Sequence, residues 1–134
     1  MSEFEVKNME LRVGDKLKVK GRVLEDAERF QIDVGRDPDH LALHFNPRFH
    51  DDTDGEVIIC NSKCDGIWGS EQRDRAFPFE KGAEVKLTMK VTGEGFEVDL
   101  PDGQELFFPD RLGLDTLNYI RVRGHFKVTS FKFS

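Results

Sequence analysis

The chain has few of the residues that mark membrane, disulfide-rich or nucleic-acid-binding proteins. Its two cysteines, Cys60 and Cys64, are too few for a disulfide scaffold, so we expect reduced thiols in the cytosol. The longest aliphatic run, 57–60, is far shorter than the roughly 20 residues that span a bilayer. Cations are outnumbered, with 20 Lys and Arg against 26 Asp and Glu and a net charge of −6. This acidity argues against general binding to nucleic acids or anionic membranes.

Polar aromatics and targeting signals are scarce as well. Twelve Phe accompany one Tyr and one Trp, Trp68, and a Phe ring belongs in a core or an interface. The lone Trp therefore needs a separate explanation. Residues 1–5 contain neither a basic start nor an apolar run, so the sequence predicts no secretory signal and synthesis in the cytosol. The length of 134 residues suits one domain with one core, which we expect to span residues 1–134.

Apolar and polar residues alternate with a period of two along most of the chain. The apolar members of the main runs are Leu17, Val19 and Val23; Phe30, Ile32 and Val34; Leu41, Leu43 and Phe45; Val85, Leu87, Met89 and Val91; and Phe96, Val98 and Leu100. Turns rich in Gly and Asp separate the runs, and at most residues 109–117 form a short helical turn. The pattern predicts an all-β protein of ten or more antiparallel strands, a β-sandwich or a barrel.

The final predicted strand changes the parity of its apolar residues. Phe126 and Val128 share one parity, whereas Phe131 and Phe133 share the other. Either a bulge or a doubly covered edge explains the change, or apolar residues of the first and last strands face a second subunit. The candidates for this dimer interface are Phe4, Val6, Phe131 and Phe133.

The richest polar segment is residues 44–49, HFNPRF. His44, Asn46 and Arg48 are spaced by two, so an extended strand places all three on one face, opposite Phe45. Imidazole and carboxamide both donate and accept hydrogen bonds, and guanidinium offers several donors. This mixture suits a ligand of neutral hydroxyl groups better than a metal or a phosphate.

A second polar segment, residues 68–73, supplies complementary groups. Glu71 and Arg73 share strand parity, and Trp68, followed by a Gly, can turn its ring over the same surface. A sugar has both hydroxyls and a C–H face, and galactose leaves one continuous apolar face for such a ring. We expect Glu71 to hold Arg48 and Arg73 by charge-assisted hydrogen bonds. Two neighbouring arginines would keep Glu71 ionised and make it a poor proton donor for glycoside hydrolysis.

Together these motifs resemble the signature of the galectins, lectins that bind β-galactosides. The resemblance rests on residues 44–48 (HFNPR), on Asn61 and on Trp68-Gly69-x-Glu71-x-Arg73, and the length and strand rhythm match a single-domain (proto-type) galectin. It implies a jelly-roll-like sandwich of two antiparallel sheets, with the sugar across the concave sheet and two subunits paired through terminal strands. It also implies a bivalent, non-enzymatic lectin that crosslinks glycoproteins and glycolipids. Such a protein would be cytoplasmic and extracellular, exported without a signal peptide.

The resemblance assigns a role to each residue of the two motifs. His44, Asn46 and Arg48 would bind the axial 4-hydroxyl of galactose and neighbouring oxygens. Asn61 and Glu71 would bind the 6-hydroxyl, Trp68 would stack on the ring, and Arg73 would join Arg48 and Glu71 at the second sugar. The carbohydrate-binding set is therefore His44, Asn46, Arg48, Asn61, Trp68, Glu71 and Arg73. The acidic loop 50–54 departs from the common family pattern, and from its charge we expect Asp51 and Asp52 to disfavour anionic extensions of the glycan, whereas Arg29 on the other side would favour them.

Other classes fit the residues less well. Cys60 and Cys64 lack a second ligand pair, and His40 and His44 lie roughly 13 Å apart on a strand, so we expect no metal and no cofactor. Residues 121–128 have the wrong spacing for an RNA-binding strand. The main alternative is an intracellular lipid-binding β-barrel of similar length, but the segment after the first strand, 16–24, predicts another strand rather than a helical lid.

Overall fold

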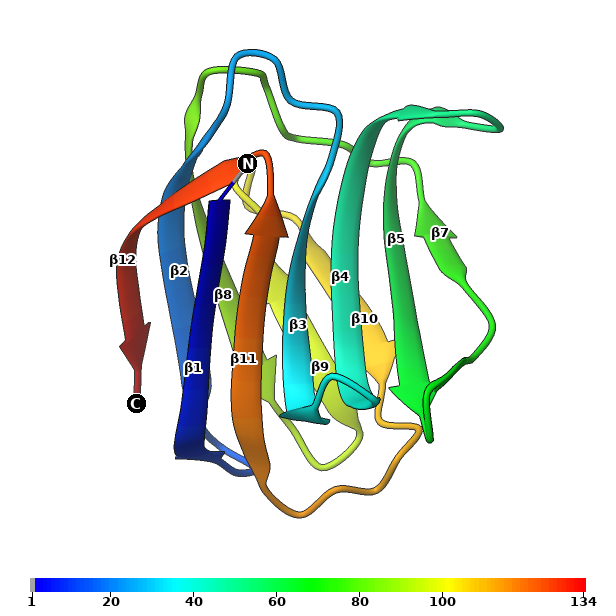
Figure 1. The fold of residues 1–134 in the computed structure, drawn as a ribbon, viewed down its shortest axis with the longest axis vertical. Helices are drawn as coiled ribbons and strands as arrows, with labels where there is room; N and C mark the ends of the chain where they lie inside the picture. Colours follow the sequence, from blue (N-terminus) through cyan, green and yellow to red (C-terminus); the bar gives the residue numbers. More distant parts are fainter. Residues whose placement is uncertain (1) are drawn as a thin grey trace.

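The structure, a computed structural model, describes residues 2–134 and contains two antiparallel sheets packed face to face (Figure 1). The first, here called the groove sheet, has the order β1 (Ser2–Leu11), β11 (Leu117–Gly124), β3 (Phe30–Asp37), β4 (His40–Asp51), β5 (Gly55–Cys64) and β6 (Ile67–Trp68), and β7 (Gln72–Asp74) also pairs with β5. The second, the back sheet, has the order β10 (Glu105–Pro109), β9 (Gly95–Asp99), β8 (Glu84–Val91), β2 (Lys16–Val23) and β12 (Phe126–Phe133).

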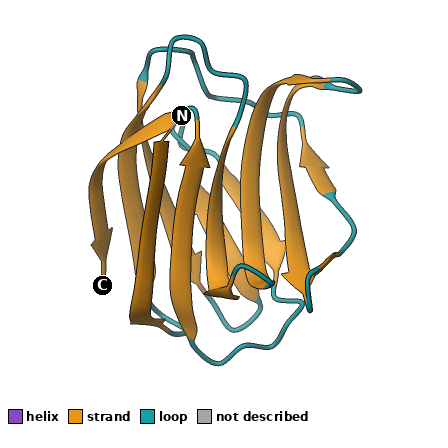
Figure 2. Cartoon of the chain, in the orientation of Figure 1, coloured by secondary structure: helices purple, strands orange, loops and turns teal. Residues whose placement is uncertain are grey.

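The prediction of an all-β, two-sheet antiparallel β-sandwich is confirmed. Figure 2 shows strands and loops only in the described part of the chain. At residues 109–117, where the sequence allowed at most a short helical turn, the structure has no helix, and residues 110–116 form a bent loop between β10 and β11. Within residues 2–134, no helix has the length and apolar character needed to cross a membrane.

Strict alternation produces the core between the sheets. Along β2 every second residue is buried, and Leu17, Val19 and Val23 enter the core while their neighbours face solvent. Phe30 of β3 stacks on Phe126 of β12, with ring centroids 4.7 Å apart, and so joins the two sheets. Side chains fill this interior, which fits a packed sandwich and not the lipid-holding barrel considered as the alternative.

One alternating run is interrupted in the structure. In β4 the pairing with β3 passes from Leu43 opposite Val34 to Leu41 opposite Gly35, which leaves Ala42 as an extra residue. Ala42 and Leu43 therefore both enter the core, while Leu41 is fully buried outside it. The expected single face for Leu41, Leu43 and Phe45 holds only for the last two.

A bulge also explains the parity change in the last strand. The register of β12 against β2 shifts between Val128 and Ser130, which leaves Thr129 as the extra residue. After the shift, Phe131 and Phe133 lie opposite Val19 and Leu17, two inward-facing positions of β2. Both Phe side chains thus stay on the inner side of the back sheet.

The interface candidates lie where β1 and β12 end the two sheets on the same side of the sandwich (Figure 1). Phe4 of β1 and Phe131 of β12 have ring centroids 5.2 Å apart, and Val6 also packs on the core. Phe133 is 49% exposed. These contacts close the edge of the sandwich within one chain, and the contact with a second subunit stays a prediction.

The two cysteines differ in their surroundings. Cys60 on β5 is completely buried, and burial raises the pKa of its thiol to about 12. Cys64 ends β5 and is exposed. Among the described residues, no group of three or more His, Cys, Asp or Glu side chains is arranged to hold a metal ion.

Candidate functional site

Strand register lines up polar side chains in a row across the outer face of the groove sheet. Glu5 lies opposite Arg121, Arg121 opposite Asp33, Asp33 opposite His44, and His44 opposite Asn61. The row crosses five strands, from β1 at the edge to β5. Residues far apart in the sequence therefore meet at one place on the sheet.

Three members of this row, Arg121, His44 and Asn61, line an open groove of about 510 Å³. Six of the seven predicted carbohydrate-binding residues line the groove: His44, Asn46, Arg48, Asn61, Trp68 and Glu71. Arg29, a predicted extended-site residue, lines it too. The seventh predicted residue, Arg73, does not line the groove but donates a hydrogen bond to Glu71, which does. The structure thus brings together side chains from β4, β5, β6 and the segment that leads into β7.

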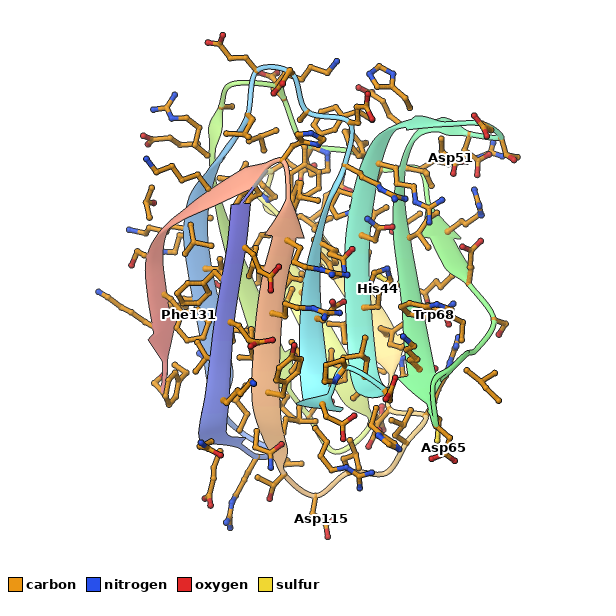
Figure 3. All side chains as sticks on the ribbon, in the orientation of Figure 1. His44, Asp51, Asp65, Trp68, Asp115 and Phe131 are labelled. Carbon is orange, nitrogen blue, oxygen red and sulfur yellow. The ribbon has the colours of Figure 1, made fainter. Side chains whose placement is uncertain are left out.

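The ring of Trp68 forms the apolar part of this site. Trp68 is 46% exposed, and its ring centroid lies 4.6 Å from that of His44 (Figure 3). Pairing with Lys63 of β5 places Trp68 on the two-residue strand β6, and the Lys63 ammonium lies 4.9 Å from the ring centroid. An exposed ring with polar groups beside it can contact the C–H face of a sugar.

Asp33 fixes the orientation of His44. Its Oδ1 lies 2.6 Å from His44 Nδ1, and its Oδ2 accepts from Gln31 at 2.7 Å and from Arg121 Nη2 at 3.2 Å. Burial of Asp33 raises its pKa, but the hydrogen bond and charge of His44, with Gln31 and Arg121, outweigh burial and leave the pKa lowered. Because a carboxylate only accepts, Nδ1 of His44 carries a proton and Nε2 is left for a ligand.

Hydrogen bonds to neighbouring protein groups hold the side chains of Asn46 and Arg48 in place. The Asn46 amide donates to the Phe30 carbonyl at 2.8 Å and accepts from Arg48 Nε at 2.9 Å. Arg48 Nη1 donates to Asp51 Oδ1 at 3.0 Å. These bonds fix both side chains before any ligand arrives and leave further donors toward the groove.

Arg73 organises the hairpin loop beside the groove. It bonds Asp51 and Asp54 at 2.9 Å each and Glu71 at 3.0 Å. The hydrogen bond from Arg73 is the main reason that the pKa of Asp51 falls far below its usual range, and Asp51 in turn raises the pKa of Arg73. We expected Glu71 to hold both arginines. Instead Glu71 holds Arg73, and Asp51 bridges Arg73 to Arg48.

The three predicted extended-site residues differ in availability. The side chain of Asp51 is only 6% exposed and is neutralised by two arginines, so it is not a free charge at the rim. Asp52 is exposed in the turn after β4. Arg29 and Asp52 line an adjacent hollow of about 260 Å³, and Arg29 also reaches the main groove.

Asn61 fixes the segment that carries Trp68. Its amide donates to the Gly69 carbonyl at 3.0 Å, while its oxygen accepts from the Ser62 backbone N–H at 2.7 Å. Arg111, from the loop after β10, donates to the Ser70 carbonyl at 2.8 Å and lies 3.3 Å from the Ser62 hydroxyl. The Trp68 segment is thereby held against β5 and the loop of residues 110–116.

Sequence reasoning missed several groove residues. Asp33 and Gln31 occupy ordinary polar positions of an alternating strand, and only pairing with β4 and β11 reveals their contacts. Arg121 and Arg123 of β11 also line the groove, within the segment 121–128 whose spacing does not match an RNA-binding strand. The sequence signal for these two residues was their spacing of two, which places Arg121 and Arg123 on the same face of a strand.

Comparisons with known proteins identify the relatives of this chain. The family model described as galactoside-binding lectin matches residues 3–133. Galectin-2 from Homo sapiens is 46% identical over 97% of this chain and 96% of its own. Among solved structures, CG-16, a homodimeric agglutinin from chicken liver, superposes with a TM-score of 0.94 at 41% identity, covering 99% of this chain and 100% of its own.

A third relative was solved with a sugar bound. The toad ovary galectin in complex with thio-digalactose superposes with a TM-score of 0.95 at 30% identity, covering 100% of this chain and 99% of its own. The chain therefore belongs to the galectin family of galactoside-binding lectins. This is a family of carbohydrate-binding proteins and not of enzymes.

Proposed function

We propose that residues 1–134 act as one carbohydrate-recognition domain that binds β-galactosides of the lactose and N-acetyllactosamine type. The observation that carries the proposal is the meeting of the exposed Trp68 ring with His44, Asn46 and Arg48 in one groove. A stacking surface beside fixed hydrogen-bonding groups suits a sugar with an apolar face and an axial hydroxyl. Membership in a galactoside-binding family supports the same ligand.

Each groove residue has a place in this proposal. His44 Nε2, Asn46 and Arg48 face the axial 4-hydroxyl, Asn61 and Glu71 face the 6-hydroxyl, and Arg48 with Glu71 reaches the second sugar. Arg73 acts at the second sugar through its bonds to Glu71 and Asp51. An equatorial 4-hydroxyl would leave desolvated groups unpaired at about 1–3 kcal/mol each, which separates galactose from glucose.

Removal of the Trp68 ring tests the site. We expect the parent to bind lactose with a Kd on the order of 10⁻⁵–10⁻³ M, and Trp68→Ala to weaken binding by about tenfold or more without loss of fold. Phe107→Ala is a matched control, because Phe107 is also exposed but lies on β10 of the back sheet. Titration calorimetry with lactose measures both. Equal lactose affinity of parent and Trp68→Ala would refute the site.

We also propose that the chain crosslinks glycoproteins and glycolipids as a homodimer paired through β1 and β12. Within residues 2–134, β1 pairs only with β11 and β12 only with β2, so each leaves one edge for another strand. Phe4, Val6, Phe131 and Phe133 lie at this side, and Phe133 is largely exposed. Two grooves in one dimer would bind two glycans at once and raise avidity.

Two finer proposals concern glycan preference and location. Arg29 and Arg123 line the groove, and in the described part of the chain neither lies within 4.0 Å of a carboxylate, which favours sulfated or sialylated extensions on that side. Exposed Asp52 acts in the opposite sense near Arg48. A glycan array that compares neutral with sulfated galactosides tests both. For location we propose the cytoplasm and the cell exterior, which cell fractionation can check.

A further inference from the structure

The outer face of the back sheet carries a concentration of positive charge that galactoside binding does not use. Along β2 the exposed residues are Lys16, Lys18, Lys20 and Arg22, in strict alternation with buried ones. The neighbouring strands add two lysines each, from β8 and from β12. Three adjacent strands thus hold eight of the 20 cations of the chain and only one of its 26 acids.

Strand register brings these charges directly opposite one another. Lys20 lies opposite Lys86, and Lys16 lies opposite Lys90, both across the β2–β8 pair. On the other side of β2, Lys18 lies opposite Lys132. Like charges in directly opposed positions destabilise a sheet, so four such pairs, with Arg22 opposite Lys127 as the fourth, are a cost to the isolated fold.

Few of these cations are neutralised within the chain. Arg22 lies 3.0 Å from Glu84, and Lys90 lies 3.6 Å from Asp99. Among residues 2–134, the other six lysines of this face have no carboxylate within 4.0 Å. A chain of net charge −6 therefore presents an unneutralised basic surface, here called the basic face, on β12, β2 and β8.

From this arrangement we propose that the basic face binds a linear sulfated polysaccharide that lies along β2. The row from Lys16 to Arg22 is about 20 Å long at the rise of an antiparallel strand, and lysines of β8 and β12 flank it on both sides. Such a row matches a narrow chain with sulfates along its length. Bound sulfates would also relieve the repulsion between the opposed lysines.

The rest of the back sheet favours a narrow polymer over a membrane. The other two strands of the same sheet, β9 and β10, are acidic on their outer face, with Glu97, Asp99 and Glu105. A bilayer wide enough to cover the sheet would bring anionic lipids against these carboxylates, whereas a linear chain on β2 avoids them. The natural twist of a sheet also limits its contact with a flat bilayer.

Nucleic acid fits the basic face less well than a sulfated sugar chain. Single-stranded nucleic acids bind strongly where aromatic side chains offer stacking surfaces for the bases. No exposed large hydrophobic side chain points outward from β12, β2 or β8 in the described residues, and Phe107 lies on β10 at the far edge of the sheet. The basic face offers charge alone.

The basic face is separate from the galactoside groove, because the two lie on the outer faces of opposite sheets (Figure 1). Both ligands can therefore bind one chain at the same time. The proposal does not rest on galactoside binding, and lactose separates the two: a polymer on the basic face is not displaced by saturating lactose.

Heparin, a linear sulfated polysaccharide, is the probe. In surface plasmon resonance on immobilised heparin we expect binding by the parent that weakens as NaCl rises, because counterions screen the lysines. The test variant is the triple substitution Lys18→Gln, Lys20→Gln, Lys86→Gln. The matched control, Lys7→Gln, Arg12→Gln, Lys81→Gln, removes three charges outside the basic face.

The expected result is a loss of heparin affinity on the order of tenfold in the test variant and less than about twofold in the control, with lactose binding unchanged in both. Equal losses in the two variants would overturn the proposal, since they would report net charge alone. Displacement of heparin by lactose would show that heparin binds in the galactoside groove, which would also overturn the proposal. If the parent bound phosphatidylserine vesicles or poly(U) as tightly as heparin or more tightly, the ligand of the basic face would be a membrane or a nucleic acid and the proposal would be wrong. Absence of heparin binding at about 0.1 M NaCl would also refute it.

Discussion

Single residues decide whether the groove is ready for its ligand, and the buried carboxylate of Asp33 is one of them. It is completely buried on β3 and receives hydrogen bonds from His44, Gln31 and Arg121. Loss of this carboxylate leaves the Arg121 guanidinium, largely buried as well, without its partner. Breaking a buried ion pair in this way is strongly destabilising.

We predict that Asp33→Ala lowers the free energy of unfolding by about 3–5 kcal/mol and weakens lactose binding, because His44 loses the acceptor that fixes its Nδ1 proton. Denaturant unfolding and calorimetry measure the two effects. Gln31→Ala is the control, since it removes only one of the three donors to Asp33. A variant as stable as the parent would contradict the role of Asp33.

At the scale of elements, a histidine joins two turns near the groove. His40, which begins β4, lies 2.8 Å from Asp37 of β3 and 2.9 Å from Asp65 in the β5–β6 turn. Hydrogen bonds to Asp37 and then to Asp65 raise the pKa of His40, while partial desolvation and the nearby Arg36 oppose them. The β5–β6 turn leads directly into Trp68, so this contact supports the strand that carries the stacking ring.

The pH dependence of stability follows from the direction of that shift. A raised folded-state pKa means that the contact of His40 is fully stabilising below the unfolded value, near 6.5, and is lost as pH rises through the higher folded value. We predict that His40→Gln lowers the melting temperature more at about pH 5.5 than at about pH 8.5. Differential scanning calorimetry checks this, with His50→Gln as a control. A larger decrease in melting temperature at the higher pH than at the lower pH would contradict this prediction.

Sequence alone reached the features that strand geometry fixes locally. A spacing of two places His44, Asn46 and Arg48 on one face without knowledge of any partner strand. The contacts of Asp33 depend on the register of β3 with β4 and with β11, and the second of these brings Arg121 to Asp33 from 88 positions away. Bulges, as at Ala42, likewise depend on a neighbouring strand, so the alternation of Leu41 with Leu43 was misleading.

The same limit applies to charge. The Arg73 network was only partly predicted, because the loop conformation decides whether Glu71 or Asp51 reaches Arg48. The basic face was visible as alternating lysines in the sequence, yet its significance depends on pairing β2 with β8 and β12. The net charge of the whole chain is negative and therefore gives no indication of this local excess of positive charge.

For the whole molecule, the edge formed by β1 and β12 tests the proposed dimer. We predict that Phe133→Asp converts a dimer to a monomer in sedimentation velocity and abolishes crosslinking, while lactose affinity is unchanged, because a charge at this half-exposed edge opposes burial against a second chain. Phe107→Asp is the control, since Phe107 is exposed on β10, at the opposite edge of the back sheet from β12. A parent that sediments as a monomer would contradict the proposal.

The contact of Phe4 with Phe131 also has a consequence for the timing of synthesis. β1 pairs only with β11 among the described strands, so β1 has no hydrogen-bonding partner in the sheet until residues 117–124 have been synthesised. β12, made still later, completes both the back sheet and the aromatic contact with β1. The sandwich therefore cannot close until nearly all of residues 2–134 have been synthesised, and because its pairings are so distant in sequence we expect its folding to take milliseconds to seconds.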